Sequence, residues 1–531
     1  MAQNRNSARV LVVGAGPVGL LLGAELLAQG VDVQVIDKAA RLGSPHSRAT
    51  VLWPRILELL DRVEVTDRVI GAGHYFDRMN YYSRKKRVGE LRLDRLRGTR
   101  YPYGIAIAQS RTEQILEERF AELGGVVRTG CELRAVSQTP DRVDVMLREA
   151  GTTPVTEFYD WVVGADGSHS AVRQLSGFTF DGQTLPVRLA ITDAELVGEV
   201  TKNEAAYFLT ERGNMALGPM GGDVFRVAAS VPAWYTGGDE PGRELFERLL
   251  AERVPGIKEV GEMRFSAIFT AHVRTADTFR RGRVFLVGDA AHVMSPAGAQ
   301  GMNTGIQDAA NLAWKLAGVS RGRYGTGILE SYDAERRPAV ARVASATTFL
   351  ARIGLYTDRT RMTVRDLTMR IGSATGVFDR SIAPRLAQLD TSYGPAGPGD
   401  PMAAGQRVPL GWTGADATPT LAPDTHTVLL WPGAEYRAAD WVPRVAAIQA
   451  VLPGLRLIDL AGRPPGALLG RLGRSRAAFV VRPDGHLATL VDLAQFDIES
   501  GAAAVAAEVA RSTARAERSD PALNRLPAVP R

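Results

Sequence analysis

Residues 10–20 read VLVVGAGPVGL, an apolar run that passes directly into a glycine-rich turn. The apolar part suits a strand that is buried on both faces of a sheet. An apolar helix is predicted over Leu20–Gln29, Gly30 stops it, and Val31–Ile36 alternate as a second strand that ends at Asp37. This order of strand, glycine turn, helix and strand predicts an α/β unit of the dinucleotide-binding kind.

Each part of the turn has a physical reason. Gly14 permits the tight turn, Gly16 lets a pyrophosphate approach the backbone, and Gly19 lets the helix pack closely on the strand. The helix N-terminus offers free N–H groups and a partial positive charge to phosphates. Asp37 ends the second strand, where a carboxylate can accept from a ribose hydroxyl. The predicted cofactor site also includes Pro17, Val18 and Lys38. By itself, this unit does not distinguish FAD from NAD.

Two later segments bear on that choice. Residues 161–167 read WVVGADG, an apolar strand that runs into Asp166 and Gly167. Residues 283–292 read RVFLVGDAAH, a second buried strand that delivers Asp289, and a glycine-rich turn and a helix over about 305–316 follow. Backbone donors and a helix N-terminus make this a second place where a ligand can bind. Asp289 is placed to accept hydrogen bonds from a polyol such as a ribityl chain.

With these segments the chain resembles the class A flavoprotein monooxygenases of the para-hydroxybenzoate hydroxylase fold. Within them it is most similar to the phenol hydroxylase-like enzymes of bacterial aromatic polyketide pathways. The GxGxxG, Asp-Gly and Gly-Asp motifs occur in the family's order, and the match continues through GIQDAANLAWKL (305–316) and Tyr332–Pro338. The resemblance covers roughly the first 345 residues and, taken together, the motifs are highly specific.

The resemblance implies non-covalent FAD as the cofactor, with NADPH or NADH as a transient reductant. It implies that Gly14, Gly16 and Gly19 hold the pyrophosphate, that Asp37 holds the adenosine ribose, and that Asp166 serves both FAD and NAD(P)H. Arg48, Gln109, Gly288 and Asp289 are implied at the ribityl and phosphate region, and Pro296, Gly301, Met302 and Asn303 beside the isoalloxazine ring. One departure is Ala299, where relatives usually carry a second glycine; alanine is strained there if the position needs a positive φ.

Several of these residues have a plainer interpretation. Arg48 can form a surface ion pair, and Asp166 can cap the turn at Gly167 without touching a ligand. His46 and His292 are weak catalytic candidates, and a hydrogen-bonded histidine packed under the loop is the commoner outcome for His292. We identify no general base.

The expected architecture is α/β: a Rossmann-like FAD-binding domain, an inserted antiparallel substrate domain and a thioredoxin-like C-terminal domain. The domain boundaries we expect are 1–177 with 276–392, then 178–275, 402–518 and a tail at 519–531. Antiparallel hairpins are predicted over 205–232. The candidate lining residues of the substrate pocket are Tyr207, Phe208, Met215, Leu217 and Phe225, of which alternation turns only half inward.

Composition excludes several classes of protein. The net charge of +6 over 531 residues makes no case for nucleic acid, and the run Arg84–Arg87 could be a phosphate or membrane patch but is interpreted as a solvated hairpin turn. Cys131 is the only cysteine, which excludes an intrachain disulfide and a cysteine-based metal site and suits a reducing cytoplasm. No metal, no membrane partner and a monomer or homodimer are expected.

The function that the resemblance implies is hydroxylation of an aromatic, polycyclic polyketide substrate by a C4a-(hydro)peroxyflavin, with NAD(P)H and O₂ as co-substrates. Two alternatives remain open: a Baeyer–Villiger or other oxidative rearrangement on the same scaffold, and a catalytically silent, flavin-bound scaffold protein. A flavin halogenase is excluded because its Trp-x-Trp-x-Ile-Pro motif is absent from the chain.

Overall fold

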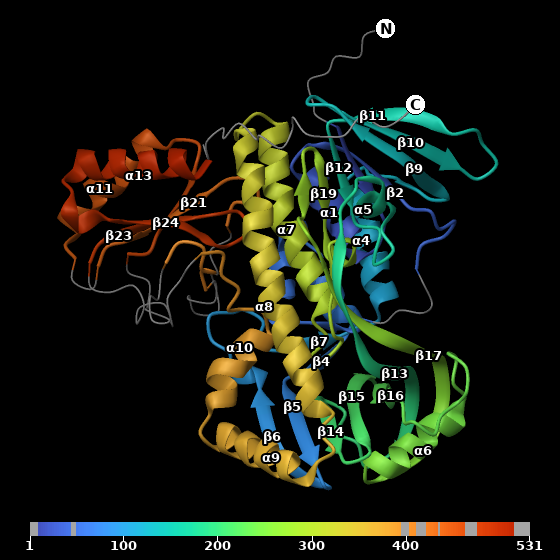
Figure 1. Ribbon diagram of the computed structural model, residues 1–531. Helices are drawn as coiled ribbons and strands as arrows, with labels where there is room; N and C mark the ends of the chain where they lie inside the picture. Colours follow the sequence, from blue (N-terminus) through green and yellow to red (C-terminus); the bar gives the residue numbers. More distant parts are fainter. Residues whose placement is uncertain are drawn as a thin grey trace.

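The computed structural model describes residues 9–43, 49–394, 403–409, 421–433, 436–461 and 475–513. Its N-terminal half is built on a six-stranded sheet of order β18-β19-β12-β1-β2-β8, shown in Figure 1. The strands are β1 (Arg9–Val13), β2 (Asp32–Ile36), β8 (Val127–Arg128), β12 (Trp161–Gly164), β18 (Arg280–Arg281) and β19 (Val284–Leu286). All neighbours are parallel except β18 and β19, so the predicted α/β class is confirmed.

The opening unit has the predicted form. Four of the five residues of β1 are buried, as expected of a strand covered on both faces. Helix α1 (Pro17–Ala28) is apolar on nearly every side and lies against the sheet. Its glycines allow this, because a Cβ added at Gly23 would lie 2.9 Å from Val35 and 3.0 Å from the ring of Phe120. Gly30 has a φ of +73° and ends the helix.

Helices cover both faces of this sheet. They are α1, α2 (Pro54–Leu60), α3 (Thr66–Ala72), α4 (Gln109–Glu122), α5 (Ala171–Leu175), α7 (Gly301–Ser320) and α8 (Glu330–Gly354), with short turns η1 (Asp61–Val63), η3 (Gly288–Ala290) and η4 (Thr326–Leu329). Helix α7 is buried over most of its length, and its side chains join the largest hydrophobic cluster of the described residues. Two three-stranded sheets flank this body: β11-β10-β9 (Val155–Tyr159, Val143–Glu149, Cys131–Gln138) and β3-β7-β4 (Val51–Leu52, Gly104–Ala106, His74–Phe76).

A second large sheet forms the lower half of the molecule in Figure 1, with the order β20-β17-β13-β16-β15-β14-β5-β6. Its strands are β5 (Arg78–Ser83), β6 (Lys86–Arg92), β13 (Phe180–Gly198), β14 (Glu204–Thr210), β15 (Gly213–Gly221), β16 (Val224–Ser230), β17 (Ile257–Ala276) and β20 (His292–Val293). The predicted antiparallel hairpins over 205–232 are confirmed. The sheet extends beyond the expected 178–275, because β5 pairs in parallel with β14 and β20 pairs with β17.

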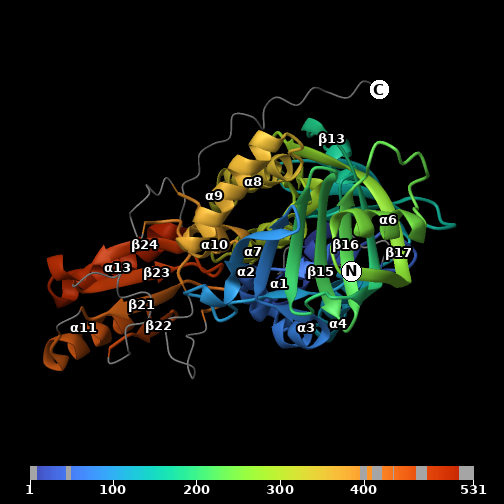
Figure 2. The ribbon, with the colours of Figure 1, turned by 90° about the horizontal axis from the view of Figure 1, so that it is seen from below.

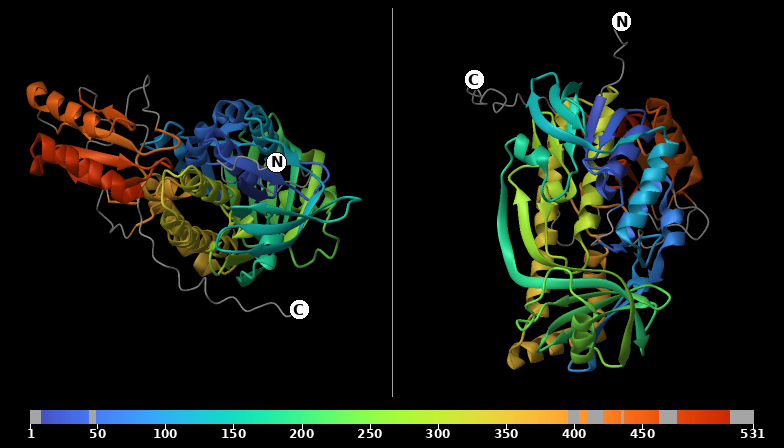
Figure 3. Two further views of the ribbon diagram at one scale, coloured as in Figure 1. Left: turned by 90° about the horizontal axis from the view of Figure 1, so that it is seen from above. Right: turned by 90° about the vertical axis from the view of Figure 1, so that its right-hand side faces the viewer.

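Helices lie on both sides of this second sheet. Helix α6 (Arg243–Arg253) packs on one face, and α9 (Arg359–Ala374) lies along β6, from Arg84 in the β5–β6 turn to Glu90. In the right-hand view of Figure 3, the gold segment that includes α9 lies at the lower end of the molecule. The chain reaches α9 from the long helix α8, which descends from the first sheet, and continues through η5 (Phe378–Ile382) and α10 (Ala383–Leu386). A short turn, η2 (Leu93–Arg95), follows β6.

The C-terminal part is a separate sheet of order β22-β21-β23-β24, beside the other two in Figure 2. Its elements are β21 (Thr427–Trp431), α11 (Ala438–Val451), β22 (Arg456–Asp459), β23 (Ala477–Val481), β24 (Leu487–Asp492), η6 (Leu493–Gln495) and α13 (Ile498–Thr513). The predicted strands near 428–430 and 478–481 are confirmed. Both helices pack their apolar side chains against the strands. Within the described ranges, no helix combines the length and the apolar character needed to cross a bilayer.

Candidate functional site

The glycine turn after β1 is tightly packed at Gly14 and Gly19 and has unoccupied space beside Gly16. A Cβ added at Gly14, whose φ is +108°, would lie 2.4 Å from the carbonyl oxygen of Ala165, and one added at Gly19 would lie 2.0 Å from the carbonyl oxygen of Gly14. A Cβ at Gly16 would meet nothing within 4 Å. The N-terminus of α1 has no side-chain cap, so its N–H groups face the unoccupied space beside Gly16. This geometry fits a pyrophosphate.

Asp37 lies at the edge of the site formed by the Gly14–Gly19 turn. Its two oxygens accept from the backbone N–H groups of Ala15 and Ala39, each at 2.8 Å. The carboxylate is only half-buried and each oxygen has a further lone pair, so it can also accept from ribose hydroxyls. Lys38 is exposed beside it.

Gln109 lies at the start of α4, one helical turn before Glu113. Its amide donates to Glu113 at 2.8 Å, and its oxygen accepts from the N–H of Ala49 at 3.4 Å. Burial, followed by smaller effects that include the charge of Asp37, raises the pKa of Glu113. Gln109 is therefore positioned by two neighbours before any ligand binds.

Asp166, at the end of β12, caps a helix and also keeps a spare acceptor. One carboxylate oxygen accepts from Ala171 and Val172 at the start of α5, at 2.6 and 3.1 Å. The other oxygen is buried and has no hydrogen-bond partner within the described structure. Burial raises the pKa of this carboxyl group. One oxygen thus caps the start of α5 rather than the turn at Gly167 considered from the sequence, and the second oxygen is an available acceptor.

The loop after β19 places one carboxylate outward and one histidine inward. Gly288 has a φ of +59°, its N–H donates to Asp308 at 3.0 Å, and the Asp289 side chain that follows is exposed. His292 is buried instead, and its Nε2 lies 2.6 Å from the Asp308 carboxylate. Arg336 donates to the other oxygen of Asp308 at 2.7 Å. This is the hydrogen-bonded arrangement weighed for His292 from the sequence.

The loop from Pro296 to the start of α7 has a special backbone. Gly298 and Ala299 have φ values of +79° and +53°, so Ala299 does occupy a left-handed conformation. The side chain of Asn303 accepts from the N–H of Trp53 at 2.9 Å and donates to the carbonyl oxygen of Val51 at 2.8 Å. Asn303 therefore ties the loop to β3 with its side chain and leaves its backbone for a ligand. Pro296, Gly301 and Met302 are at least partly exposed in this loop.

Sequence reasoning missed Gln388, which holds this loop from behind. Gln388 is buried with a φ of +56°, and its amide donates to the side chain of Gln300 at 2.5 Å and to Thr304 at 3.0 Å. It lies after α10, far along the chain from the loop. No local pattern around it signals the contact.

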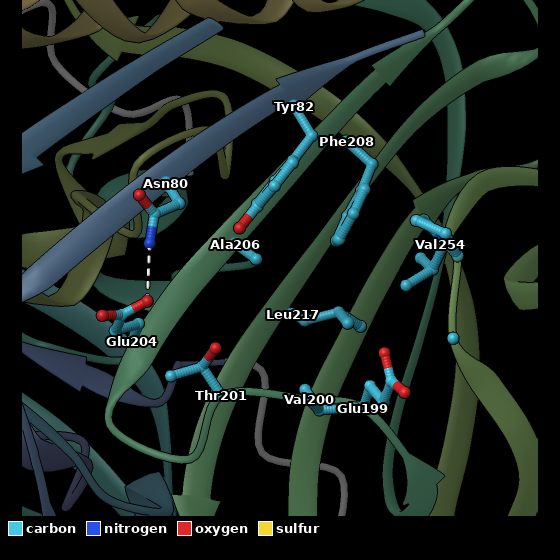
Figure 4. A pocket seen from close by; sticks show the side chains of 12 residues that line it. Asn80, Tyr82, Glu199, Val200, Thr201, Glu204, Ala206, Phe208, Leu217 and Val254 are labelled. Atoms are coloured by element: carbon cyan, nitrogen blue, oxygen red, sulfur yellow. Dashed lines mark hydrogen bonds between the residues drawn. The ribbon is translucent and has the colours of Figure 1, made fainter. Parts of the chain in front are cut away.

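The five predicted lining residues do not share one face of the eight-stranded sheet. Phe208 pairs with Met215, and Leu217 and Phe225 lie on the same side; all four pack in the cluster beneath α6. Phe208 and Leu217 also line a cavity of about 250 Å³ on that side, shown in Figure 4. Tyr207 points to the opposite side, toward the cluster of Trp53 and Phe76, and contacts the backbone of Gly298.

The side with Tyr207 therefore faces the Pro296–Asn303 loop, and it carries small residues. Ala216 lies opposite Tyr207, Ala228 lies opposite Ala216, and Gly218 is two residues further along β15. Directly opposed residues in neighbouring strands share a face. All three are partly exposed in mid-sheet, because no long side chain covers them. We name Tyr207, Ala216, Gly218 and Ala228 the small-residue face.

One buried ion pair borders this face and was missed from the sequence. Arg226 lies opposite Gly218, and Asp193 lies opposite Arg226 on the next strand. The guanidinium donates twice to the carboxylate, at 2.5 and 3.0 Å, and lies 5.1 Å from the ring centre of Phe265. A planar cation held in a fork by a carboxylate is well suited to orient oxygen atoms of a ligand. His46 and Arg48 lie outside the described residues.

Known proteins match most of this chain, both as a family model and as individual relatives. The family model described as "FAD binding domain" matches residues 7–347. The 6-methylpretetramide 4-monooxygenase of Streptomyces rimosus is 32% identical over 520 residues, with 92% of this chain and 91% of that protein covered. An anhydrotetracycline monooxygenase of the same species is 31% identical over 90% of this chain and 94% of its own length.

Solved structures agree over nearly the whole chain. The anhydrotetracycline hydroxylase OxyS from Streptomyces rimosus superposes with a TM-score of 0.74 at 27% identity, covering 96% of this chain and 99% of its own. CabE, an aromatic hydroxylase from angucycline biosynthesis, superposes with a TM-score of 0.72 at 28% identity, covering 91% and 96%.

Proposed function

Because the chain belongs to the FAD binding domain family and is a flavin-dependent monooxygenase, we propose that it hydroxylates an aromatic, polycyclic polyketide in the biosynthesis of an antibiotic or similar metabolite. The observation that carries this proposal is the small-residue face. Alanine and glycine opposite the Pro296–Asn303 loop leave room for a broad, flat substrate. The names of two relatives, a 6-methylpretetramide 4-monooxygenase and a 12-dehydrotetracycline 5-monooxygenase/anhydrotetracycline 6-monooxygenase, favour the same substrate class.

The cofactor residues follow from the site geometry. In this proposal the turn at Gly14, Gly16 and Gly19 holds the pyrophosphate of FAD, and Asp37 accepts from the adenosine ribose. Gln109, Asp289 and the free oxygen of Asp166 face the ribityl region, and the loop from Pro296 through Gly301, Met302 and Asn303 flanks the isoalloxazine. When bound, FAD supplies the electron transfer from NAD(P)H to O₂ and the activated oxygen atom.

The residues of the chain then position the substrate and exclude water. Burial raises the pKa of Tyr207, so its phenol stays protonated and can donate a hydrogen bond to a substrate oxygen. Arg226, oriented by Asp193, can hold a phenolic or ketone oxygen at the other end of the face. Two fixed polar groups separated by a small-residue surface would orient one ring edge toward the flavin.

The domain arrangement is part of the same proposal. A discontinuous FAD-binding domain over 1–177 and 276–392 would hold the cofactor, and a substrate domain over 178–275 would be completed by β5 and β6. A thioredoxin-like domain over 402–518 would pack beside them. The four-stranded sheet with α11 and α13 supports this last assignment.

The first experiment is the absorption spectrum of purified protein before and after anaerobic NADPH, with and without a polycyclic phenol. Faster flavin bleaching in the presence of the phenol is expected for a substrate-gated hydroxylase. Product analysis by NMR then separates the two oxygenations, since a hydroxylated ring and an inserted ring oxygen have the same mass. A lactone product would show that the reaction is a Baeyer–Villiger oxidation and not a hydroxylation. A protein that takes up no FAD would refute the proposal.

The substrate surface is tested by Ala228→Leu, which places an isobutyl group on the small-residue face. Overfilling costs about 1–3 kcal/mol of substrate binding, so kcat/KM for the polycyclic substrate should fall about 5- to 150-fold. Turnover of a single-ring phenol should change much less. Ala206→Leu is the matched control, because Ala206 faces the cavity on the α6 side. Equal losses in both variants would place the substrate elsewhere.

A further inference from the structure

The basic run Arg84–Arg87 forms the turn between β5 and β6, and it lies beside α9. Arg84 donates to the backbone oxygen of Arg359 and to the hydroxyl of Thr363, both at 3.3 Å. Arg84 and Arg359 also share a single acid, Glu211, at 4.0 and 3.8 Å. Two parts of the chain that are far apart in sequence therefore form one basic surface at the end of the molecule (Figure 1).

The turn keeps its charges at a conformational cost. Arg84 and Lys85 have φ values of +48° and +63°, a combination that hairpin turns normally give to asparagine and glycine. Lys85, Lys86 and Arg87 are exposed. Four consecutive cations thus lie at a turn where asparagine and glycine would adopt the same backbone conformation with less strain.

Helix α9 adds an apolar row to this surface. Met362, Arg365 and Met369 bury the inner side of the helix. The outer side of a solvated helix is normally polar, but the outer side of α9 carries apolar residues. The exposed apolar residues, with their exposed fractions, are Val364 (61%), Leu367 (56%) and Ile371 (54%) on α9 and Phe349 (62%) on α8. Val364, Leu367 and Ile371 are spaced to lie along one helix face.

Arginines flank this row, and the acidic residue of α9, Asp366, is buried. Arg359, Arg361 and Arg370 are exposed on α9. Asp366 is the only acidic residue of the helix, and it is buried and bonded to Arg365 at 2.8 Å. We name the 84–87 turn and the outer side of α9 the basic tip.

We propose that the basic tip binds an anionic lipid bilayer surface, with the apolar row of α9 inserted among the headgroups. An apolar helix face bordered by cations is the feature that holds peripheral helices at such interfaces, and clustered Lys and Arg add attraction to anionic lipids. A second copy of the chain fits poorly, since a two-fold contact would place arginines against arginines. Nucleic acid fits poorly too, because the exposed apolar residues of α9 (Val364, Leu367 and Ile371) are aliphatic and cannot stack on bases.

The position of α9 suggests why such a contact is useful. On its inner side Met369 packs with Leu209, and Tyr81 beside them stacks on Tyr207 at 5.5 Å. Packed side chains thus connect the inner side of α9 to Tyr207 of the small-residue face, through Met369 and Tyr81. A lipophilic aromatic substrate dissolved in the bilayer would meet the protein next to its proposed binding surface. From the sequence we expected a solvated turn and no membrane partner, because the neighbourhood of α9 is not visible there.

The test uses the full-length, FAD-loaded protein and vesicles of phosphatidylcholine with and without phosphatidylglycerol. We expect co-sedimentation with the phosphatidylglycerol vesicles at low ionic strength, loss of binding at high salt, and none with phosphatidylcholine alone. The variant Lys85→Gln/Lys86→Gln should lower the partition constant about 30-fold, because each cation near an anionic leaflet accounts for about fivefold. Lys258→Gln/Arg264→Gln, which removes two exposed cations elsewhere, should bind like the wild type.

The apolar row has its own variant. Leu367→Gln should weaken vesicle binding about tenfold, while Val126→Gln, at an apolar side chain that is 73% exposed elsewhere, should not. No sedimentation with anionic vesicles, or equal losses in tip and control variants, would overturn the proposal. Binding to polyglutamate without binding to vesicles would assign the surface to an acidic protein instead. None of these readouts depends on the substrate, so they stand or fall separately from the proposed function.

Discussion

Ala299 is one of the few non-glycine residues of the described chain with a positive φ, and it lies in the loop proposed to flank the isoalloxazine. Its φ of +53° brings the Cβ close to the following carbonyl oxygen, a conformation that costs an L-residue about 1–2 kcal/mol. Glycine avoids this cost, although it loses more backbone entropy on folding. The neighbouring bonds from Asn303 and Gln300 hold the loop in place despite the strain.

We therefore expect Ala299→Gly to raise the free energy of unfolding by up to about 1 kcal/mol in urea denaturation. The control is Ala297→Gly, since Ala297 does not have a positive φ and should lose stability on gaining backbone freedom. If both substitutions destabilise equally, the strain at Ala299 is relieved in some other way.

Asp37 also acts at the scale of one side chain. Asp37→Ala removes the carboxylate that receives the Ala15 N–H and the proposed ribose contact. Hydrogen bonds to a charged group contribute about 1.5–3 kcal/mol, so the Kd for FAD should rise about 10- to 100-fold. Fluorescence titration of the apoprotein with FAD measures this. Asp32→Ala, at the exposed start of the same strand, should leave the Kd unchanged.

At the scale of elements, the turn between β23 and β24 is inserted against α7 and α8. Arg482 donates to both oxygens of Glu335 on α8, at 2.8 and 2.9 Å, and to Asp484 at 2.6 and 3.1 Å. Lys315 on α7 donates to Glu335 at 2.8 Å, and Asn311 bridges the two acids. All of these side chains are buried, so each charge depends on its partners.

Removing one member of this group should be costly. Arg482→Met leaves Glu335 and Asp484 buried without the guanidinium that donates to both, and we expect a loss of about 3–5 kcal/mol in unfolding free energy. Arg511→Met breaks an exposed helix pair with Glu508 and should cost no more than about 0.5 kcal/mol. Similar small losses in both variants would show that the C-terminal sheet is not anchored through this turn.

At the scale of the whole molecule, two buried histidines predict an acid limit to stability. Burial lowers the pKa of His426 and of His486 to about 4, below the value of about 6.5 in an unfolded chain. Between these values the unfolded chain binds more protons at these two histidines than the folded one, so their contribution to stability rises with pH from 4 to 6.5 and is constant above. The slope is at most about 1.4 kcal/mol per pH unit for each histidine.

Urea denaturation at a series of pH values across this window measures the slope. His486→Gln should reduce it by about half, whatever its effect on stability at neutral pH. His169 is exposed, so His169→Gln should leave the profile as it is. A slope that does not change in His486→Gln would mean that other groups dominate the acid transition.

Local patterns predicted the elements that depend on local interactions. The glycine turn at Gly14, the strand that leads to Asp37 and the hairpins over 205–232 appear where periodicity and turn residues placed them. The strand before Asp289 ends earlier than expected, at Leu286, and Asp289 lies in the short turn that follows. The lining residues of the substrate pocket were harder to predict. Alternation shows which residues share a face of the sheet, but not which face meets the Pro296–Asn303 loop. Phe208 and Tyr207 are neighbours in sequence and point to opposite sides of the sheet.

The sequence by itself determined the α/β class, the dinucleotide turn and the three motifs of a flavin-dependent monooxygenase, because local patterns of apolar residues and glycines specify the individual strands, turns and helices. Only the tertiary structure decided which sheet face meets the loop at Gly298, that Gln388 holds that loop, and that Arg84 lies beside α9. These contacts join residues separated by more than 80 positions. Their geometry is set by how whole elements pack, and no local pattern in the chain encodes it.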